Sequence, residues 1–132
     1  PLICYEVIFP ELANSDISAD FLVNITNDAW FGNSTGPQQH LAAARLRAIE
    51  QQRYVLRSAN TGVSAIIAPD GNVIKSLGYN QDGFIELDVP VSKPIKTIYS
   101  SLGLKLVLPV IILSIVFAYF LISKFKLSSI LI

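Results

Sequence analysis

The sequence has few residues of the kinds that bind metals or form cross-links. Its 132 residues include one cysteine, one histidine and no methionine. A single cysteine cannot form a disulfide within the chain, and one Cys with one His, without a CxxC or HxxxH spacing, argues against a zinc site. We therefore expect no metal site and no cofactor. Because the sequence begins with Pro1 and contains no Met, we expect it to be the C-terminal piece of a longer protein.

Charge is absent from one long segment. From Leu106 to Ser123 there are eighteen residues without a charged side chain, most of them Leu, Ile, Val and Phe. As a helix at about 1.5 Å per residue, this run is about 27 Å long, which is close to the hydrocarbon thickness of a bilayer. A buried core helix is the alternative, but the rest of the chain is too small to wrap a helix that is apolar on every side. The pattern predicts a transmembrane helix over residues 104–123.

The formal net charge of zero hides an asymmetry along the chain. Residues 1–103 carry seven Lys and Arg against ten Asp and Glu, and the rest carries three lysines and no acid. Lys124 and Lys126 follow the predicted span, although Lys105 precedes it. Basic residues favour the cytoplasmic side, so we expect a short cytoplasmic tail over 124–132 and the remaining domain across the membrane, in the periplasm of a bacterium. We expect no nucleic-acid partner.

Cys4 ends a short apolar run that is typical of a buried strand, and the following residues up to Pro10 are typical of a turn into a helix. A thiol at such an elbow lies near backbone N–H groups, which lower its pKa and favour a nucleophile. The alternative is that Cys4 is simply a small buried apolar residue.

Apolar runs and turn signals predict an α/β (α+β layered) domain in residues 1–92, followed by a linker over 93–103. We expect strands at 21–25, 54–58, 63–67, 73–77 and 83–89, a short helix at 10–14 and a longer helix from Pro37 to about Arg53. The longer helix should bury a stripe of Leu41, Ala42, Leu46 and Ile49, and it should carry an Arg47–Glu50 ion pair. Upstream residues would complete the sheet.

The polar loop between residues 26 and 36 holds several candidate site residues. Trp30 and Phe31 are expected to form core or a pocket wall, and contact with acyl chains or a membrane surface is the alternative. Asn27 and Asp28 are expected to hold the loop through turn hydrogen bonds. His40 is expected to be structural or exposed rather than a catalytic base.

Several segments together resemble the nitrilase superfamily and, within it, the apolipoprotein N-acyltransferase family of bacterial inner membranes. The matching segments, which run in the family's order over about residues 1–90, are Ile3–Glu6, Phe21–Gly32, Pro37–His40, Arg47–Glu50 and Arg57–Gly62. The resemblance implies the C-terminal half of an α-β-β-α sandwich, followed by one transmembrane helix. It also implies a Glu-Lys-Cys triad of which only Cys4 lies here, with the base Glu and the Lys upstream, so that this piece is inactive alone.

The same resemblance implies a reaction and its partners. Cys4 would take an acyl chain from a phospholipid as a thioester and pass it to the N-terminal amine of a diacylglyceryl-prolipoprotein at the bilayer, with the protein favoured as a monomer. Tyr5 would supply an oxyanion donor, and Glu6 would orient the elbow, bind the amine or simply accept backbone amides; Asn27, Asp28, Trp30 and Phe31 would support the site. A nitrilase-type amidase that uses water, and a membrane-tethered interaction domain with an incidental Cys4, are the alternatives.

Overall fold

A computed structural model describes residues 1–14, 18–90 and 95–128, and at 104, 106 and 123–128 it describes the backbone alone. Contacts divide the chain into two compact units, Pro1–Ser101 and Leu102–Ile132. The predicted linker 93–103 and tail 124–132 include positions outside the described residues, and the predicted span 104–123 includes positions where only the backbone is described. Their boundaries therefore stay predictions.

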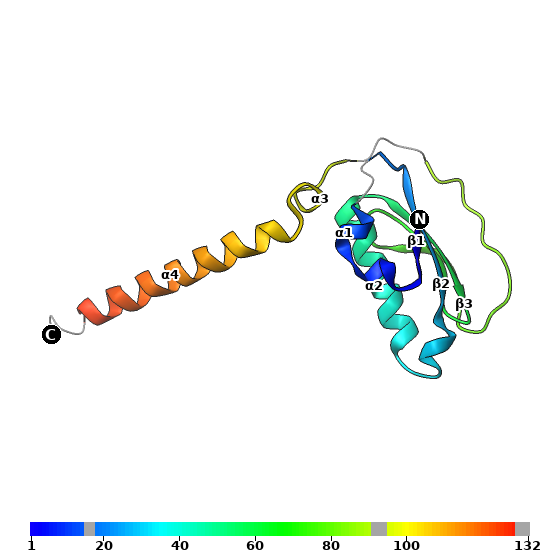
Figure 1. Cartoon of the computed structure of the whole chain (residues 1–132), viewed down its shortest axis with the longest axis horizontal. Coiled ribbons are helices and arrows are strands. Elements are labelled where there is room, and N and C mark those ends of the chain that lie inside the picture. The colour runs from blue at the N-terminus through cyan, green and yellow to red at the C-terminus, as the bar shows by residue number, and fades with distance from the viewer. Residues whose placement is uncertain (15–17, 91–94, 129–132) are drawn as a thin grey trace. The chain divides into compact units, whose positions relative to one another are not determined.

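The first unit is built on a five-stranded sheet in the order β1-β2-β3-β4-β5 (Figure 1). The first three strands are parallel and the last two are added antiparallel, as a hairpin edge. Their bounds are Leu2–Ile3, Phe21–Asn27, Tyr54–Asn60, Ser64–Ile67 and Val73–Leu77. The strands expected at 21–25, 54–58, 63–67 and 73–77 are confirmed.

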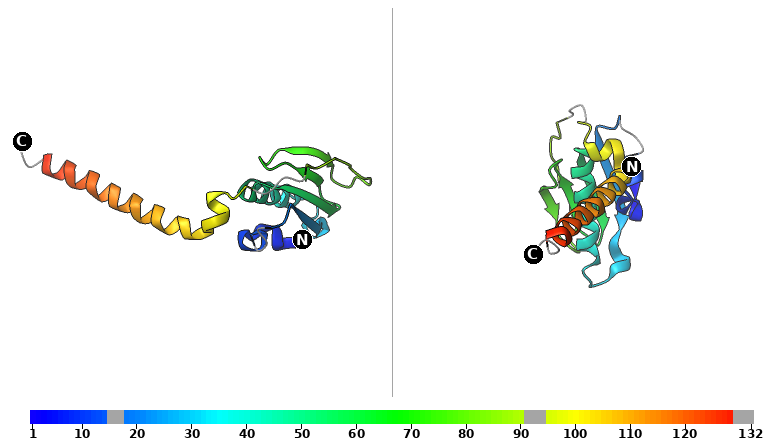
Figure 2. Two further views of the ribbon diagram at one scale, coloured as in Figure 1. Left: turned by 90° about the horizontal axis from the view of Figure 1, so that it is seen from above. Right: turned by 90° about the vertical axis from the view of Figure 1, so that its left-hand side faces the viewer.

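Helices connect the parallel strands, since such strands need crossover connections rather than hairpins. The 3-10 helix η1 (Cys4–Ile8) and the helix α1 (Pro10–Ala13) join β1 to β2. The 3-10 helix η2 (Asp28–Phe31) and the helix α2 (Gly36–Gln51) join β2 to β3. The connections pack against each other on one face of the sheet, as Figures 1 and 2 show. Pro10 and Pro37 lie in the first turns of their helices, where a missing N–H costs little.

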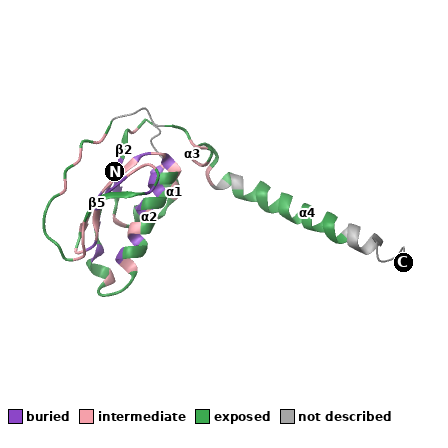
Figure 3. Ribbon diagram, turned by 180° about the vertical axis from the view of Figure 1, so that it is seen from behind, coloured by how far each residue is buried: buried purple, intermediate pink, exposed green. Residues whose placement is uncertain are grey.

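The core lies between this helical layer and the sheet, where the buried residues gather in Figure 3. Val7 from η1 and Val55 from β3 are fully buried. Ala44 and Ala48 of α2 are also fully buried and belong to the same core cluster. Small side chains on α2 let its backbone approach the sheet closely. Most of the buried strand residues lie on this face, and Ile66 of β4 is buried on the opposite one.

The buried stripe predicted for α2 is wrong at three of its four positions. Leu41 packs against the core as predicted, but Ala42 is exposed and Leu46 and Ile49 are 53% and 42% exposed. The buried positions of the helix are Pro37, His40, Ala44, Arg47, Ala48 and Gln51. Two of the polar side chains on the buried side have charged partners: Arg47 pairs with Glu50 at 2.9 Å, as predicted, and His40 contacts Asp28 at 2.8 Å. Hydrophobicity alone therefore misplaces the sheet-facing side of this helix.

The strand predicted at 83–89 is also wrong, because this segment pairs with no strand. It runs instead beside the sheet face that the described helices leave uncovered (Figure 1). The segment and the sheet form a groove whose lining includes Val23, Leu56 and Ile66. Lys75 Nζ donates to the carbonyl of Glu86 at 2.6 Å. The alternating apolar side chains of the segment thus meet the sheet face without extending the ladder.

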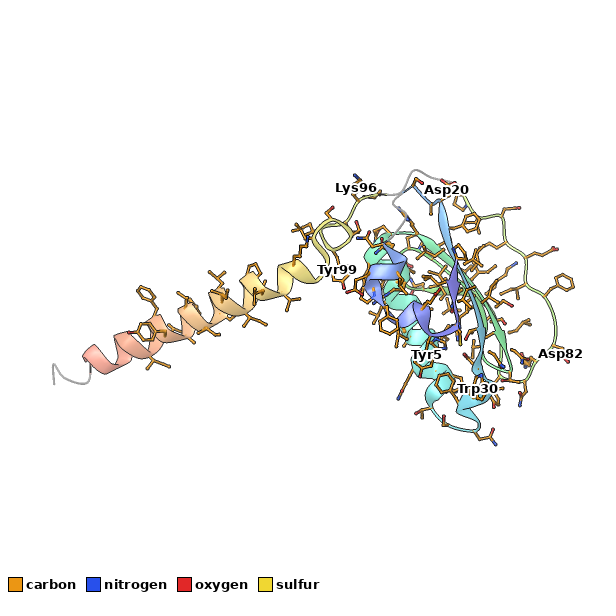
Figure 4. All side chains as sticks on the ribbon, in the orientation of Figure 1. Tyr5, Asp20, Trp30, Asp82, Lys96 and Tyr99 are labelled. Atoms are coloured by element: carbon orange, nitrogen blue, oxygen red, sulfur yellow. The ribbon has the colours of Figure 1, made fainter. Side chains whose placement is uncertain are left out.

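The residues after 94 return to the helical layer before the first unit ends. Thr97 Oγ1 donates to the carbonyl of Glu50 at 2.6 Å, and Asn14 Nδ2 donates to the carbonyl of Ser100 at 2.7 Å. Figure 4 shows Tyr99 in this segment. The end of the first unit is therefore tied to both α1 and α2.

The second unit consists of helical segments. After α3 (Ile98–Leu102) come the 3-10 helix η3 (Gly103–Leu106) and the helix α4 (Val107–Ser128). In the described part of the chain, no helix combines the length and the apolarity that crossing a membrane requires. The span over 104–123 stays a prediction.

Ile67 is fully buried in the core of the first unit, so its truncation tests the packing. We expect Ile67→Ala to lower the free energy of unfolding by about 2–5 kcal/mol, because it removes apolar contacts and leaves a cavity. Ile74→Ala on the neighbouring β5, where the side chain is 43% exposed, is the control and should cost much less. Denaturant unfolding of the full-length protein measures both; equal losses would contradict this core.

Candidate active site

Cys4 occupies a strained turn between β1 and η1. Its backbone φ is 51°, a value that residues with a side chain rarely adopt. The turn is closed by the Glu6 carboxylate, which accepts a hydrogen bond from the Ile3 N–H at 2.7 Å. This geometry confirms the predicted strand-to-helix elbow and presents the sulfur at the carboxyl end of a parallel strand.

Hydrogen-bond donors surround the Cys4 sulfur, which is half-buried. The Thr26 hydroxyl lies 3.6 Å from Sγ. This hydroxyl is the main cause of a lowered Cys4 pKa, and the backbone N–H groups of Asn27 and Tyr5 lower that pKa further. Burial and the negative charge of Asp28 act in the opposite direction. The net effect favours the thiolate, which is the nucleophilic form of cysteine.

The Thr26 hydroxyl also contacts a buried carboxylate, Asp28. Its Oδ2 accepts from Arg57 at 2.6 Å, and both side chains are fully buried. Its Oδ1 lies 2.8 Å from His40 Nδ1 and 3.1 Å from Thr26 Oγ1. Since a carboxylate only accepts hydrogen bonds, His40 donates through Nδ1 in this contact.

Arg57 connects this carboxylate to the backbone of the elbow. Leu2, Asn24 and Arg57 lie in register across β1, β2 and β3. Arg57 donates to Asn24 Oδ1, and Asn24 Nδ2 donates to the carbonyls of Leu2 and Cys4 at 3.0 and 3.4 Å. Burial lowers the pKa of Arg57, and its contact with Asp28 opposes that effect. We call Asn24, Thr26, Asp28, His40 and Arg57 the elbow network.

Aromatic rings cover the network on the side of η1. The Tyr5 ring stacks on His40 with centroids 5.3 Å apart, and Phe31 lies edge-on to His40 at 5.7 Å. His40 is therefore buried rather than exposed, and the expectation that it is not a catalytic base stays a prediction. Its Nε2 is buried and has no hydrogen-bond partner among the described residues.

For the loop between residues 26 and 36, the structure confirms one of the predicted roles and corrects two. Asn27 caps η2 by accepting from the Ala29 N–H at 3.1 Å, which confirms its turn role. Asp28 holds the loop through a buried ion pair rather than a turn hydrogen bond, because Arg57 reaches it from β3. Trp30 is 85% exposed, so the expectation that it packs into the core is wrong. Figure 4 shows Trp30 at the same end of the first unit as Tyr5.

No group of three or more His, Cys, Asp and Glu side chains in the described ranges is arranged to hold a metal ion. The arrangement around Cys4 is suited instead to attack by sulfur on a carbonyl carbon. Donors that stabilise a thiolate also stabilise the negative oxygen that forms in such an attack, provided that they reach it.

Comparison with known proteins assigns this chain to a family. Residues 1–99 match the family model of carbon-nitrogen hydrolases. The chain belongs to the carbon-nitrogen hydrolase family. Among curated members similar to it, the apolipoprotein N-acyltransferase of Bradyrhizobium diazoefficiens (strain USDA 110) is 51% identical over 104 residues, which cover 78% of this chain and 19% of that protein. The enzyme of the same name from Rickettsia bellii (strain RML369-C) is 44% identical over 124 residues, which cover 93% and 24%.

The chain spans about a fifth of the length of these relatives. Among solved structures, Nit3 of Saccharomyces cerevisiae, described as a member of branch 10 of the nitrilase superfamily, is 26% identical. It superposes with a TM-score of 0.47 and covers 61% of this chain and 33% of that chain. The place of the chain among the carbon-nitrogen hydrolases therefore rests on the sequence matches.

Sequence reasoning gave no site role to three members of the elbow network. Asn24 and Thr26 were assigned to an apolar strand and a loop, and Arg57 to a strand and a family-matching segment. The missed signal is the alternation of Asn24, Thr26 and Asp28, which places three polar groups on one face of a strand and its end. A buried arginine in a strand also requires a carboxylate partner.

The close fit of Gly62 against Asp28 allows a test of the network. A methyl group at Gly62 would overlap the Asp28 carboxylate, so Gly62→Ala should push Asp28 away from Arg57. We expect the free energy of unfolding to fall by about 1–3 kcal/mol. Gly78→Ala is the matched control, because the added methyl would meet only the side chain of Gln81. Equal unfolding midpoints for the two variants in denaturant would refute this packing.

Proposed function

We propose that this chain is the nucleophile-bearing part of an apolipoprotein N-acyltransferase. The observation that carries the proposal is the Cys4 sulfur at a strained elbow, facing the Thr26 hydroxyl and backbone N–H groups. Support comes from the curated relatives, which bear this name at 44–51% identity. A thiolate so placed can hold an acyl group as a thioester.

The proposed reaction has two steps. In the first, the Cys4 thiolate attacks an ester carbonyl of a phospholipid; the sulfur–carbon bond forms, the carbon–oxygen bond breaks, and the lysophospholipid alcohol leaves with a proton. In the second, the amine of a diacylglyceryl-cysteine attacks the thioester; the amide bond forms, the sulfur–carbon bond breaks, and the amine gives up a proton. The thiolate is regenerated, so the covalent intermediate divides one difficult transfer into two.

The roles of the neighbouring residues follow from their contacts. The Tyr5 N–H lies next to the sulfur and is our candidate oxyanion donor. The Glu6 carboxylate closes the turn by accepting a hydrogen bond from the Ile3 N–H, and we propose that its role is to orient the elbow. Asp28 is committed to Arg57 and His40, so we assign the general base and the lysine of the triad to residues outside this sequence.

We also propose that the enzyme acts at a membrane. Support comes from the uncharged run 106–123 in the sequence and from Trp30, which is exposed beside the site as an aromatic available to lipid. We propose a span over 104–123, with the catalytic unit on the periplasmic side and the tail in the cytoplasm. Both substrates would then lie in the same bilayer as the enzyme, which favours their encounter.

A hydrolase is the second candidate function, and the description of the matched family as carbon-nitrogen hydrolases favours it. In that case water rather than an amine would attack the acyl-enzyme. The elbow and its donors would serve both reactions equally, because both begin with attack by the sulfur on a carbonyl carbon. The two functions differ in which nucleophile accepts the acyl group, and a carbon-nitrogen hydrolase would release an amine rather than an alcohol in the first step.

Mass spectrometry of the full-length protein after incubation with phospholipid tests the proposal. We expect a fatty-acyl adduct on the peptide that carries Cys4, and loss of that adduct when a diacylglyceryl-peptide acceptor is added. Cys4→Ala should remove the adduct and reduce amide formation by about a thousandfold or more, because the nucleophile itself is gone.

Each alternative gives a different result in the same assay. Release of free fatty acid without an amide product would favour the hydrolase. Amide formation at the normal rate by Cys4→Ala would refute a role for this sulfur. Cys4→Ser is the matched control for size, since it keeps the volume of the site and loses only the thiolate.

A further inference from the structure

The Thr26 hydroxyl lies between two acceptors. Its Oγ1 is 3.6 Å from Cys4 Sγ and 3.1 Å from Asp28 Oδ1. A hydroxyl carries a single hydrogen and can donate it to only one of them at a time. The hydrogen therefore has two positions, and the charge on the sulfur decides which of them is favoured.

The oxygen of Thr26 is held in place while its hydrogen is free to turn. Thr26 is a buried, β-branched residue in β2, which restricts the rotation of its side chain. The other acceptor is equally fixed, because Asp28 also binds Arg57 and His40. Asp28 thus keeps its partners when the Thr26 hydrogen turns away.

We propose that the Thr26 hydroxyl is a two-position donor for the candidate nucleophile. It donates to the sulfur when Cys4 is a thiolate, and it turns to the Asp28 carboxylate when Cys4 is a thiol or an acyl thioester. The proposal rests on the proposed function for the acyl state only, since the thiol and thiolate exist without substrate. No proton leaves Thr26 at any stage, and only the O–H bond rotates.

This arrangement serves both halves of an acyl transfer. A donor on the thiolate stabilises the free enzyme in its reactive form, and the same donor stabilises the sulfur as it leaves the thioester. While the acyl group is attached, the sulfur is a poor acceptor, and Asp28 takes the hydrogen instead. The hydroxyl is thereby paired at each stage, with the sulfur in the thiolate state and with the buried carboxylate in the other states.

Thr26 is neutral, so its replacement leaves the charges around the sulfur unchanged. The charged and titratable groups near Cys4 are Asp28 on η2, Arg57 on β3, His40 and Tyr5 in the ring stack, and Glu6 in the elbow turn. Thr26→Val has nearly the same shape and removes only the hydroxyl. Any change in thiol titration then reports on the hydrogen bond.

The test is the rate of Cys4 alkylation by iodoacetamide as a function of pH in the full-length protein, followed by mass spectrometry of the Cys4 peptide. In the unmodified protein we expect the half-maximal rate below pH about 8.5, the ordinary pKa of a cysteine. Thr26→Val should raise that midpoint by about one pH unit, which lowers the rate near neutral pH about tenfold. The limiting rate at high pH should remain the same.

Two further variants separate the hydrogen bond from general packing. Thr26→Ser keeps the hydroxyl and should restore the midpoint, whereas Thr35→Val makes the same change at an exposed helix cap and should leave it unaltered. An unchanged midpoint in Thr26→Val, or an equal shift in Thr26→Ser, would overturn the proposal. If Thr26→Val does not fold cooperatively, Thr26→Ala is compared with Thr26→Ser by the same criterion.

The alkylation assay needs neither phospholipid nor lipoprotein, so the two proposals can fail separately. A shifted midpoint in Thr26→Val, with no acyl adduct on Cys4, would retain the two-position donor and reject the acyltransferase function. An acyl adduct with an unshifted midpoint would do the reverse.

Discussion

The buried ion pair between Asp28 and Arg57 is the interaction on which the rest of this site depends. Both side chains are fully removed from solvent, and the oxygen and nitrogen that join them are 2.6 Å apart. Burying two charges costs several kcal/mol for each ion unless other hydrogen bonds compensate. Here His40 and Thr26 approach the carboxylate, and Asn24 and the Val63 carbonyl accept from the guanidinium. The pair and its partners therefore connect η2, α2, β2 and β3 through Asp28, His40, Thr26 and Arg57.

The consequence of this arrangement is a rigid support under a strained residue. Asn24 accepts a hydrogen bond from Arg57 and donates to the carbonyls of Leu2 and Cys4. Side chains of the two neighbouring strands therefore fix the backbone of the elbow. From the other side, the Glu6 carboxylate closes the turn. A positive φ at Cys4 costs free energy, and such strain persists only where the surroundings fix it. A fixed nucleophile with fixed donors suits a reaction whose transition state carries negative charge.

A feature can be predicted from the sequence when the residues that form it are close to one another along the chain. The Cys4 elbow, the helix α2 and the β4–β5 hairpin follow from neighbouring residues, and all are confirmed. The alternation of Asn24, Thr26 and Asp28 is a local pattern, but it does not reveal Arg57, the partner of Asn24 and Asp28, which lies far along the chain. The wrong stripe on α2 has the same cause, since the buried His40 and Arg47 are polar. Trp30 was misplaced because a large apolar side chain is usually assigned to a core.

The most direct test of the central claim is a double-mutant cycle on the ion pair, read as the free energy of unfolding of the full-length protein. Asp28→Asn and Arg57→Met each leave a buried group without its partner and should cost about 3–5 kcal/mol. The double variant should cost clearly less than the sum of the two, by at least about 1 kcal/mol. Additive losses, within about 0.5 kcal/mol, would contradict the claim that this pair organises the site.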